Sequence, residues 1–216
     1  MRNRFKFSEE QKQQIKEAIK DLESHSSGEI VPYFTHNSDD YFEARWKSAV
    51  LLSVFGALLL AIASYTWMLP FAVTPLEDAI FIGVLMLIGF FIPVVIPTAV
   101  RFLLSEDTLH LRVMNRAMSI FLQEEVFKTR DRTGVLIYIS ELEHEVVVLA
   151  DSGINAKVAS EDWQNITQLV IDGIKDRQVD KGLINAINAC KKLLLENGFT
   201  VRSDDTNELS DELRID

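Results

Sequence analysis

Apolar residues are distributed unevenly along the chain, with an apolar middle between two charged ends. Two runs, at about residues 48–69 and 79–100, contain no Asp, Glu, Lys, Arg or His. A helix rises 1.5 Å per residue, so about 20 apolar residues cross the hydrocarbon core of a bilayer. Two adjacent runs of this length rarely fit inside a small soluble domain as core helices, which is the alternative interpretation. The pattern therefore predicts a transmembrane hairpin over residues 45–104, with the lipid bilayer as its partner.

Basic residues stand beside the predicted spans and predict their orientation. Arg45 and Lys47 precede the first span and Arg101 follows the second, whereas residues 70–78 contain no Lys or Arg. The positive-inside rule then places both termini in the cytoplasm, as in a multi-pass protein of the inner (cytoplasmic) membrane. Aromatic side chains that favour the membrane interface stand near the span ends: Trp46, Tyr65 and Trp67.

The charged ends show the periodicities of a soluble α/β domain. A capping box at Ser8 opens an amphipathic helix, and β-formers follow at residues 29–35. Beyond the spans we expect a long helix from Ser105. Two strands are then expected, at residues 134–140 and 145–150. Three helices follow them, at residues 154–158, 160–175 and 178–197.

This order predicts an α/β fold in which helices sandwich a small mixed sheet and the transmembrane hairpin interrupts the domain. Residues 1–44 form its N-terminal part and residues 105–198 its C-terminal part. Residues 199–216 hold six acidic residues against two arginines, and we expect a loosely packed, solvated acidic tail.

The charge and the cysteine content of the chain limit which functions and compartments are compatible with the sequence. The net charge of −10 argues against a nucleic-acid partner, because a phosphate backbone is bound by surplus Lys and Arg. The single cysteine, Cys190, provides no disulfide framework and agrees with a reducing compartment.

Several segments together resemble one protein family. They are Ser27–Pro32, Ser38–Tyr41, Thr129–Ile137, Leu149–Val158, Trp163, Gly182-Leu183 and Asn207–Leu209. In combination they resemble the TPM domain family, in particular its bacterial membrane branch, in which a two-helix transmembrane hairpin is inserted in the domain. The resemblance implies the α/β fold. It leaves the activity open, since some plant members are described as acid phosphatases with a bound divalent cation and other members as accessory factors in assembly or repair of membrane complexes.

The sequence contains none of the standard phosphatase motifs. A thiol phosphatase needs an arginine six positions after its cysteine, and Glu196 stands at that place after Cys190. The chain also lacks an Asp-x-Asp-x-Thr string, a glycine-rich phosphate loop of the G-x-x-x-x-G-K type and an H-E-x-x-H motif.

A carboxylate cluster is the remaining candidate for chemistry. The candidate site residues stand at predicted strand ends: Glu29, Asp39, Asp40, Thr133 and Asp151, with Asp131 nearby. If their loops meet at one edge of the sheet, Asp40 and Asp151 would be the metal ligands, and oxygen ligands of this kind select Ca²⁺ or Mg²⁺. The alternative is that these aspartates form turns and cap helices.

Two functional hypotheses follow, and we favour the first. It is a membrane-anchored domain that serves as an interaction or assembly factor at the cytoplasmic membrane face and binds another membrane protein. The second is a divalent-metal-dependent phosphatase that uses the carboxylate cluster. A path for small solutes, formed by oligomerised spans, is a weaker third hypothesis.

Overall fold

The structure, a computed structural model, describes residues 5–66, 74–159, 161–201 and 207–216. Trp67 and the end of the first predicted span lie outside the described residues. The chain divides into two compact units. One is formed by Asp40–Leu109, and the other by Asn3–Asp39 together with His110–Asp216.

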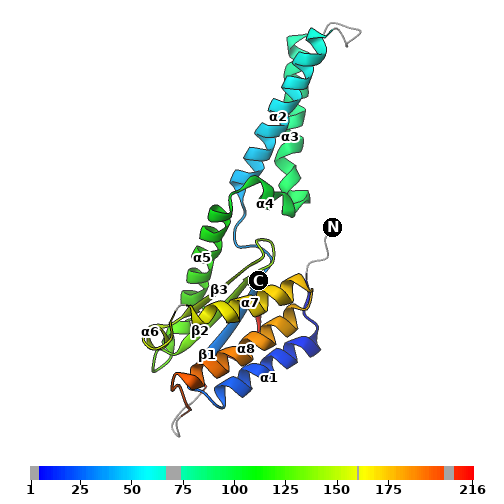
Figure 1. Cartoon of the computed structure of the whole chain (residues 1–216). Helices are drawn as coiled ribbons and strands as arrows, with labels where there is room; N and C mark the ends of the chain where they lie inside the picture. Colours follow the sequence, from blue (N-terminus) through cyan, green and yellow to red (C-terminus); the bar gives the residue numbers. More distant parts are fainter. Residues whose placement is uncertain (1–4, 67–73, 160, 202–206) are drawn as a thin grey trace. The chain divides into compact units, whose positions relative to one another are not determined.

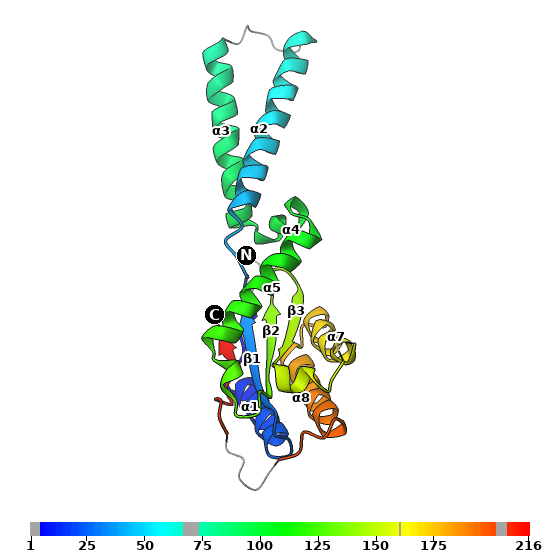
Figure 2. The same cartoon turned by 90° about the vertical axis from the view of Figure 1, so that its left-hand side faces the viewer.

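The first unit is a helical hairpin. Its two long helices, α2 (Phe42–Tyr65) and α3 (Pro75–Val95), lie side by side (Figures 1 and 2). Both are long enough and apolar enough to cross a membrane. α3 begins at a capping box, in which the Glu77 carboxylate accepts a hydrogen bond of 2.8 Å from the Thr74 amide. The unit continues after α3 into a 3₁₀ turn, η1 (Pro97–Ala99), and the short helix α4 (Val100–Leu103).

Small residues bring α2 and α3 into close contact. A Cβ atom added to Gly89 would lie 2.7 Å from the Cα atom of Ala49, so only glycine permits this approach. The outward side chains are large and apolar, and many of them are more than half exposed, including Leu51, Phe55 and Leu87. This distribution is typical of helices that pack through small residues and face lipid elsewhere. It does not fit the alternative of two buried core helices.

The second unit is built around a four-stranded mixed sheet. Its strands are β1 (Glu29–Thr35), β2 (Gly134–Ser140), β3 (Glu145–Ala150) and β4 (Arg214–Ile215), in the order β3-β2-β1-β4. β1 pairs in parallel with both β2 and β4, and β2 pairs in antiparallel with β3. Every residue of β1 and β2 is buried, as expected for strands that are covered on both faces.

Helices cover both faces of this sheet (Figures 1 and 2). One face packs against α1 (Glu9–Glu23), α7 (Asp162–Lys175) and α8 (Val179–Glu196), and the other against α5 (Glu106–Gln123). The short 3₁₀ helix η2 (Val126–Lys128) precedes β2, and the short helix α6 (Ser152–Asn155) follows β3. The predicted α/β fold, with helices on both sides of a small mixed sheet, is confirmed.

The C-terminal tail is docked over residues 207–216, and the expectation of a loosely packed extension is wrong there. β4 extends the sheet beside Tyr33 and Phe34 of β1. Leu209 and Leu213 pack against the two hydrophobic clusters, one on each face of the sheet. The physical reason is that apolar residues interrupt the acidic ones, and two of them, Leu209 and Leu213, are partly buried against these clusters.

The close contact at Gly89 gives a testable prediction. Gly89→Leu is expected to lower the free energy of unfolding of the detergent-solubilised protein by about 1–3 kcal/mol, because the larger side chain forces α2 and α3 apart. The measurement is SDS-induced unfolding followed by the fluorescence of Trp46, whose ring lies 5.2 Å from that of Phe90 on α3. Gly83→Leu is the matched control, because nothing lies within 4 Å of a Cβ atom at Gly83. Equal effects of the two substitutions would contradict the prediction.

Candidate functional site

The candidate residues Glu29, Thr133 and Asp151 lie at one end of the sheet. Glu29 starts β1, Thr133 precedes β2, and Asp151 follows the antiparallel strand β3. The Glu29 amide donates to the Thr133 carbonyl at 3.2 Å, and the Asp151 amide donates to the Gly134 carbonyl at 2.9 Å. All three candidate residues are buried. β2 separates Glu29 from Asp151, so their Cα atoms are about 10 Å apart.

The Glu29 carboxylate holds the C-terminal tail. It accepts hydrogen bonds from the amides of Glu208 at 3.2 Å and Leu209 at 3.3 Å. The Glu208 carboxylate in turn accepts a bond of 2.9 Å from the amide of Arg130. Glu29 therefore fixes Asn207–Leu209, one of the segments on which the family resemblance is based, to the start of β1.

Asp151 caps the short helix α6. Its Oδ1 atom accepts a hydrogen bond of 2.6 Å from the amide of Ser152. Its Oδ2 atom is buried without a hydrogen-bond partner among the described residues, and lies 3.5 Å from Nε of Arg132 in an ion pair. Gly153 completes the turn, because a Cβ atom there would lie 2.2 Å from the carbonyl oxygen of Asp131. Asp151 therefore has the role that was the alternative to metal binding, in a turn that leads into a helix.

Asp39 lies at the opposite end of the sheet. It follows β1, whose seven residues span about 20 Å, and Oδ2 of Asp39 pairs with a guanidinium nitrogen of Arg112 at 3.1 Å. Asp40 belongs to the hairpin unit. The expected convergence of the strand-end carboxylates on one edge is therefore not met, because Glu29 and Asp39 stand at opposite ends of the same strand. No group of three or more His, Cys, Asp or Glu side chains that could hold a metal ion occurs within the described part of the chain.

A second acidic group, which the sequence reasoning missed, surrounds Glu23 at the end of α1. The amide group of Asn207 donates to the carboxylates of Glu23, at 3.3 Å, and Asp211. Burial raises the pKa of the Glu23 carboxyl to about 9, and the charges of Glu29 and Asp211 act in the same direction. Glu23 is therefore neutral at pH 7. No local signal identifies this group, since its members are far apart in the sequence.

Cys190 cannot serve as a nucleophile at neutral pH. The residue is fully buried on α8, and burial raises the pKa of its thiol to about 12. A thiolate is the reactive form of cysteine, so this side chain is a core residue.

A mixed four-stranded sheet with helices on both faces defines the class as an α/β domain. The sequence model of the TPM domain family matches residues 98–193, so the chain carries a TPM domain and the family resemblance is confirmed. No curated protein sequence matches the chain.

One solved structure shares the fold. It is the NMR structure of the BA42 protein from the psychrophilic bacterium Bizionia argentinensis, with a TM-score of 0.60 and 18% sequence identity. The match covers 100% of this chain and 99% of that chain. This likeness supports the architecture and carries no activity.

The environment of Glu23 predicts a pH dependence of stability. Its pKa is about 9 in the folded chain and about 4.3 for an unperturbed glutamate. Between these values the folded state holds a proton that the unfolded state has released, so the free energy of unfolding falls as the pH rises. Glu23→Gln is expected to remove this decline and to raise Tm above that of the wild type, most strongly at the alkaline end.

Thermal unfolding between about pH 5 and pH 9 measures this effect. Glu17→Gln is the control, because Glu17 is exposed on the same helix. Melting temperatures of the wild type and Glu23→Gln that change in parallel with pH would rule out the protonated state of Glu23.

Proposed function

We propose that the chain is a membrane-anchored TPM domain protein that acts as an interaction or assembly factor at the cytoplasmic face of the inner membrane. Its α/β unit binds another membrane protein there. The observation that carries this proposal is the hairpin, whose two long helices expose large apolar side chains along their length.

The residues at the ends of the hairpin support an orientation with the α/β unit in the cytoplasm. Arg45 and Lys47 lie in the first turns of α2, and Arg101 lies in α4. The Arg45 guanidinium stacks 4.5 Å above the ring of Phe42, and the neighbour of Arg101, Phe102, is 90% exposed. At the opposite end of the hairpin, the first turn of α3 contains Glu77 and Asp78, and neither helix has a basic residue there among the described residues.

The contacts of the candidate carboxylates favour a binding role over catalysis. Glu29 is engaged with tail amides, Asp39 with Arg112, and Asp151 with the Ser152 amide and Arg132. These interactions stabilise loops and the tail. None of these contacts joins a carboxylate to a side-chain hydroxyl or thiol that could act as a nucleophile.

Membrane insertion and orientation are tested by cysteine accessibility. The background is Cys190→Ser, to which either Leu76→Cys, at the start of α3, or Gln14→Cys, on the exposed face of α1, is added. In bacterial spheroplasts, a membrane-impermeant maleimide should label the Leu76→Cys variant directly and the Gln14→Cys variant only after permeabilisation. The protein should also stay in the pellet after alkaline carbonate extraction. Release by carbonate, or labelling of the Gln14→Cys variant in sealed spheroplasts, would disprove the proposal.

A divalent-metal-dependent phosphatase is the alternative, and one observation favours it. The buried Oδ2 atom of Asp151, which lies 3.5 Å from Nε of Arg132, has no hydrogen-bond partner among the described residues and could serve as an oxygen ligand to a cation. Purified protein is assayed with an aryl phosphate, with and without Mg²⁺ or Ca²⁺. We expect no hydrolysis above that of Asp151→Asn, which keeps an N-cap side chain for α6. Metal-dependent hydrolysis that Asp151→Asn abolishes would replace the interaction role with the phosphatase.

A further inference from the structure

The two edges of the sheet differ in how they are covered. Beyond β1, the edge carries β4 of the chain's own tail. β3 forms the other edge, with no strand beside it among the described residues. Exposed strand edges usually carry protective features such as proline, lysine or a bulge. The sequence of β3, Glu-Val-Val-Val-Leu-Ala, contains neither proline nor lysine and is rich in β-branched residues.

The pairing register shows which backbone groups of β3 are free. The Asp151 amide donates to Gly134 of β2, and hydrogen-bonded positions alternate along an antiparallel pair. Val147 and Leu149 therefore face β2, whereas the backbone groups of Val146 and Val148 face outward. No hydrogen bond to these outward groups is made within the part of the chain that the structure describes. At Ala150, the carbonyl is already engaged by the Asn155 side chain at 2.6 Å.

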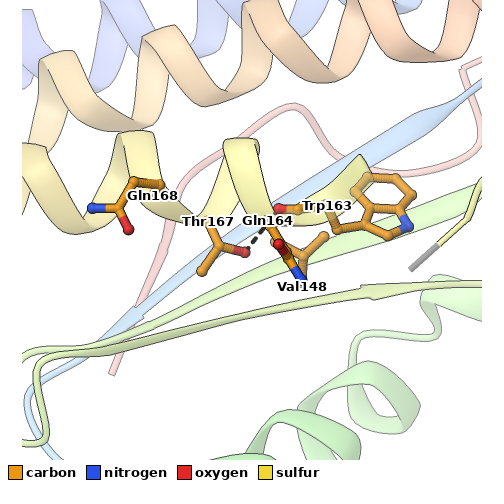
Figure 3. A pocket seen from close by; sticks show the side chains of 5 residues that line it. All are labelled: Val148, Trp163, Gln164, Thr167 and Gln168. Atoms are coloured by element: carbon orange, nitrogen blue, oxygen red, sulfur yellow. Dashed lines mark hydrogen bonds between the residues drawn. The ribbon is translucent and has the colours of Figure 1, made fainter. Parts of the chain in front are cut away.

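A pocket lies beside this free edge, between β3 and α7. Its volume is about 390 Å³, and Figure 3 shows the five side chains that line it, Val148, Trp163, Gln164, Thr167 and Gln168. Val148 rises from the strand toward α7, and Trp163 and Gln168 stand on either side of it (Figure 3). An extended segment that pairs with β3 would point every second side chain toward this pocket.

The charge of α7 determines which segment fits. The helix and its capping residues carry four acidic side chains, Glu161, Asp162, Asp172 and Asp176, against the single basic residue Lys175. All of these side chains are exposed. A second copy of the chain would bring two such acidic helices together, which like-charge repulsion opposes. A basic segment is attracted instead.

We propose that the free edge of β3 and its adjoining pocket bind an extended, basic segment of a partner protein by β-strand addition. Backbone hydrogen bonds to Val146 and Val148 provide the register, and an apolar side chain of the partner enters the pocket beside Val148. The inference rests on the proposed interaction function and names the chemistry of the partner.

The test uses the full chain in lipid nanodiscs and a library of nonapeptides. Each peptide has lysine at both ends and a core drawn from Val, Ile, Thr and Tyr. The wild type should retain a subset of these peptides, and exchanging their lysines for glutamates should weaken binding at low salt. Val148→Pro removes the outward amide, at a position that an edge strand tolerates, and should raise Kd about tenfold or more. Val148→Thr keeps the amide and should bind within about twofold of the wild type.

A second pair of variants keeps the test decisive if Val148→Pro does not fold. Gln168→Lys adds a positive charge beside the pocket, which repels the lysines of the peptides and should weaken binding. Gln14→Lys adds the same charge on α1 and should leave binding unchanged. The inference would be overturned if the wild type retained no peptide. It would also be overturned if Val148→Pro and Gln168→Lys retained the peptides as well as the wild type does. Self-association that Val148→Pro abolishes would assign the edge to a second copy and would also overturn it. Carbonate extraction is measured separately, so a failure here is distinguishable from a failure of membrane anchoring.

Discussion

The parallel pairing of β1 with β2 is the constraint on which the rest of the structure depends. The two strands pair from Glu29 with Gly134 to Thr35 with Ser140, and the whole helical hairpin lies between them in the sequence. Two strands of one sheet must be in the same compartment. An insertion between them that enters a bilayer has to cross it an even number of times. A hairpin of two apolar helices is compatible with this requirement.

Elements with strong local patterns could be predicted from the sequence. The three longer strands are found at the predicted residues, because runs of β-branched residues ended by polar turns are a local signal. The helices of the α/β unit differ from the prediction by a few residues at their ends. α2 and α3 begin earlier than the predicted spans, since Phe42 and Pro75 open helices whose first turns contain charges. The tail was mispredicted, because its docking depends on contacts with residues far away in the sequence, such as Glu29.

The candidate site was predictable only in part, for a geometric reason. Acidic residues at strand ends are visible in the sequence, but the end of the sheet at which each one lies depends on strand direction and order. Glu29 and Asp151 share an end because β3 runs antiparallel to its neighbour, while Asp39 follows β1 to the other end. The raised pKa of Glu23 was beyond sequence reasoning, because it requires burial together with two carboxylates from distant segments.

The order of the strands along the chain has a consequence for biosynthesis. A ribosome makes β1 first, then both apolar helices, and only afterwards the strand that pairs with it. While the hairpin helices are being made, the seven residues of β1, all buried in the finished fold, have no partner strand and are exposed to chaperones or to aggregation. The residues that pair with the other side of β1 are translated later still. A nascent chain arrested before residue 207 would therefore carry an unfinished sheet beside a completed helical hairpin.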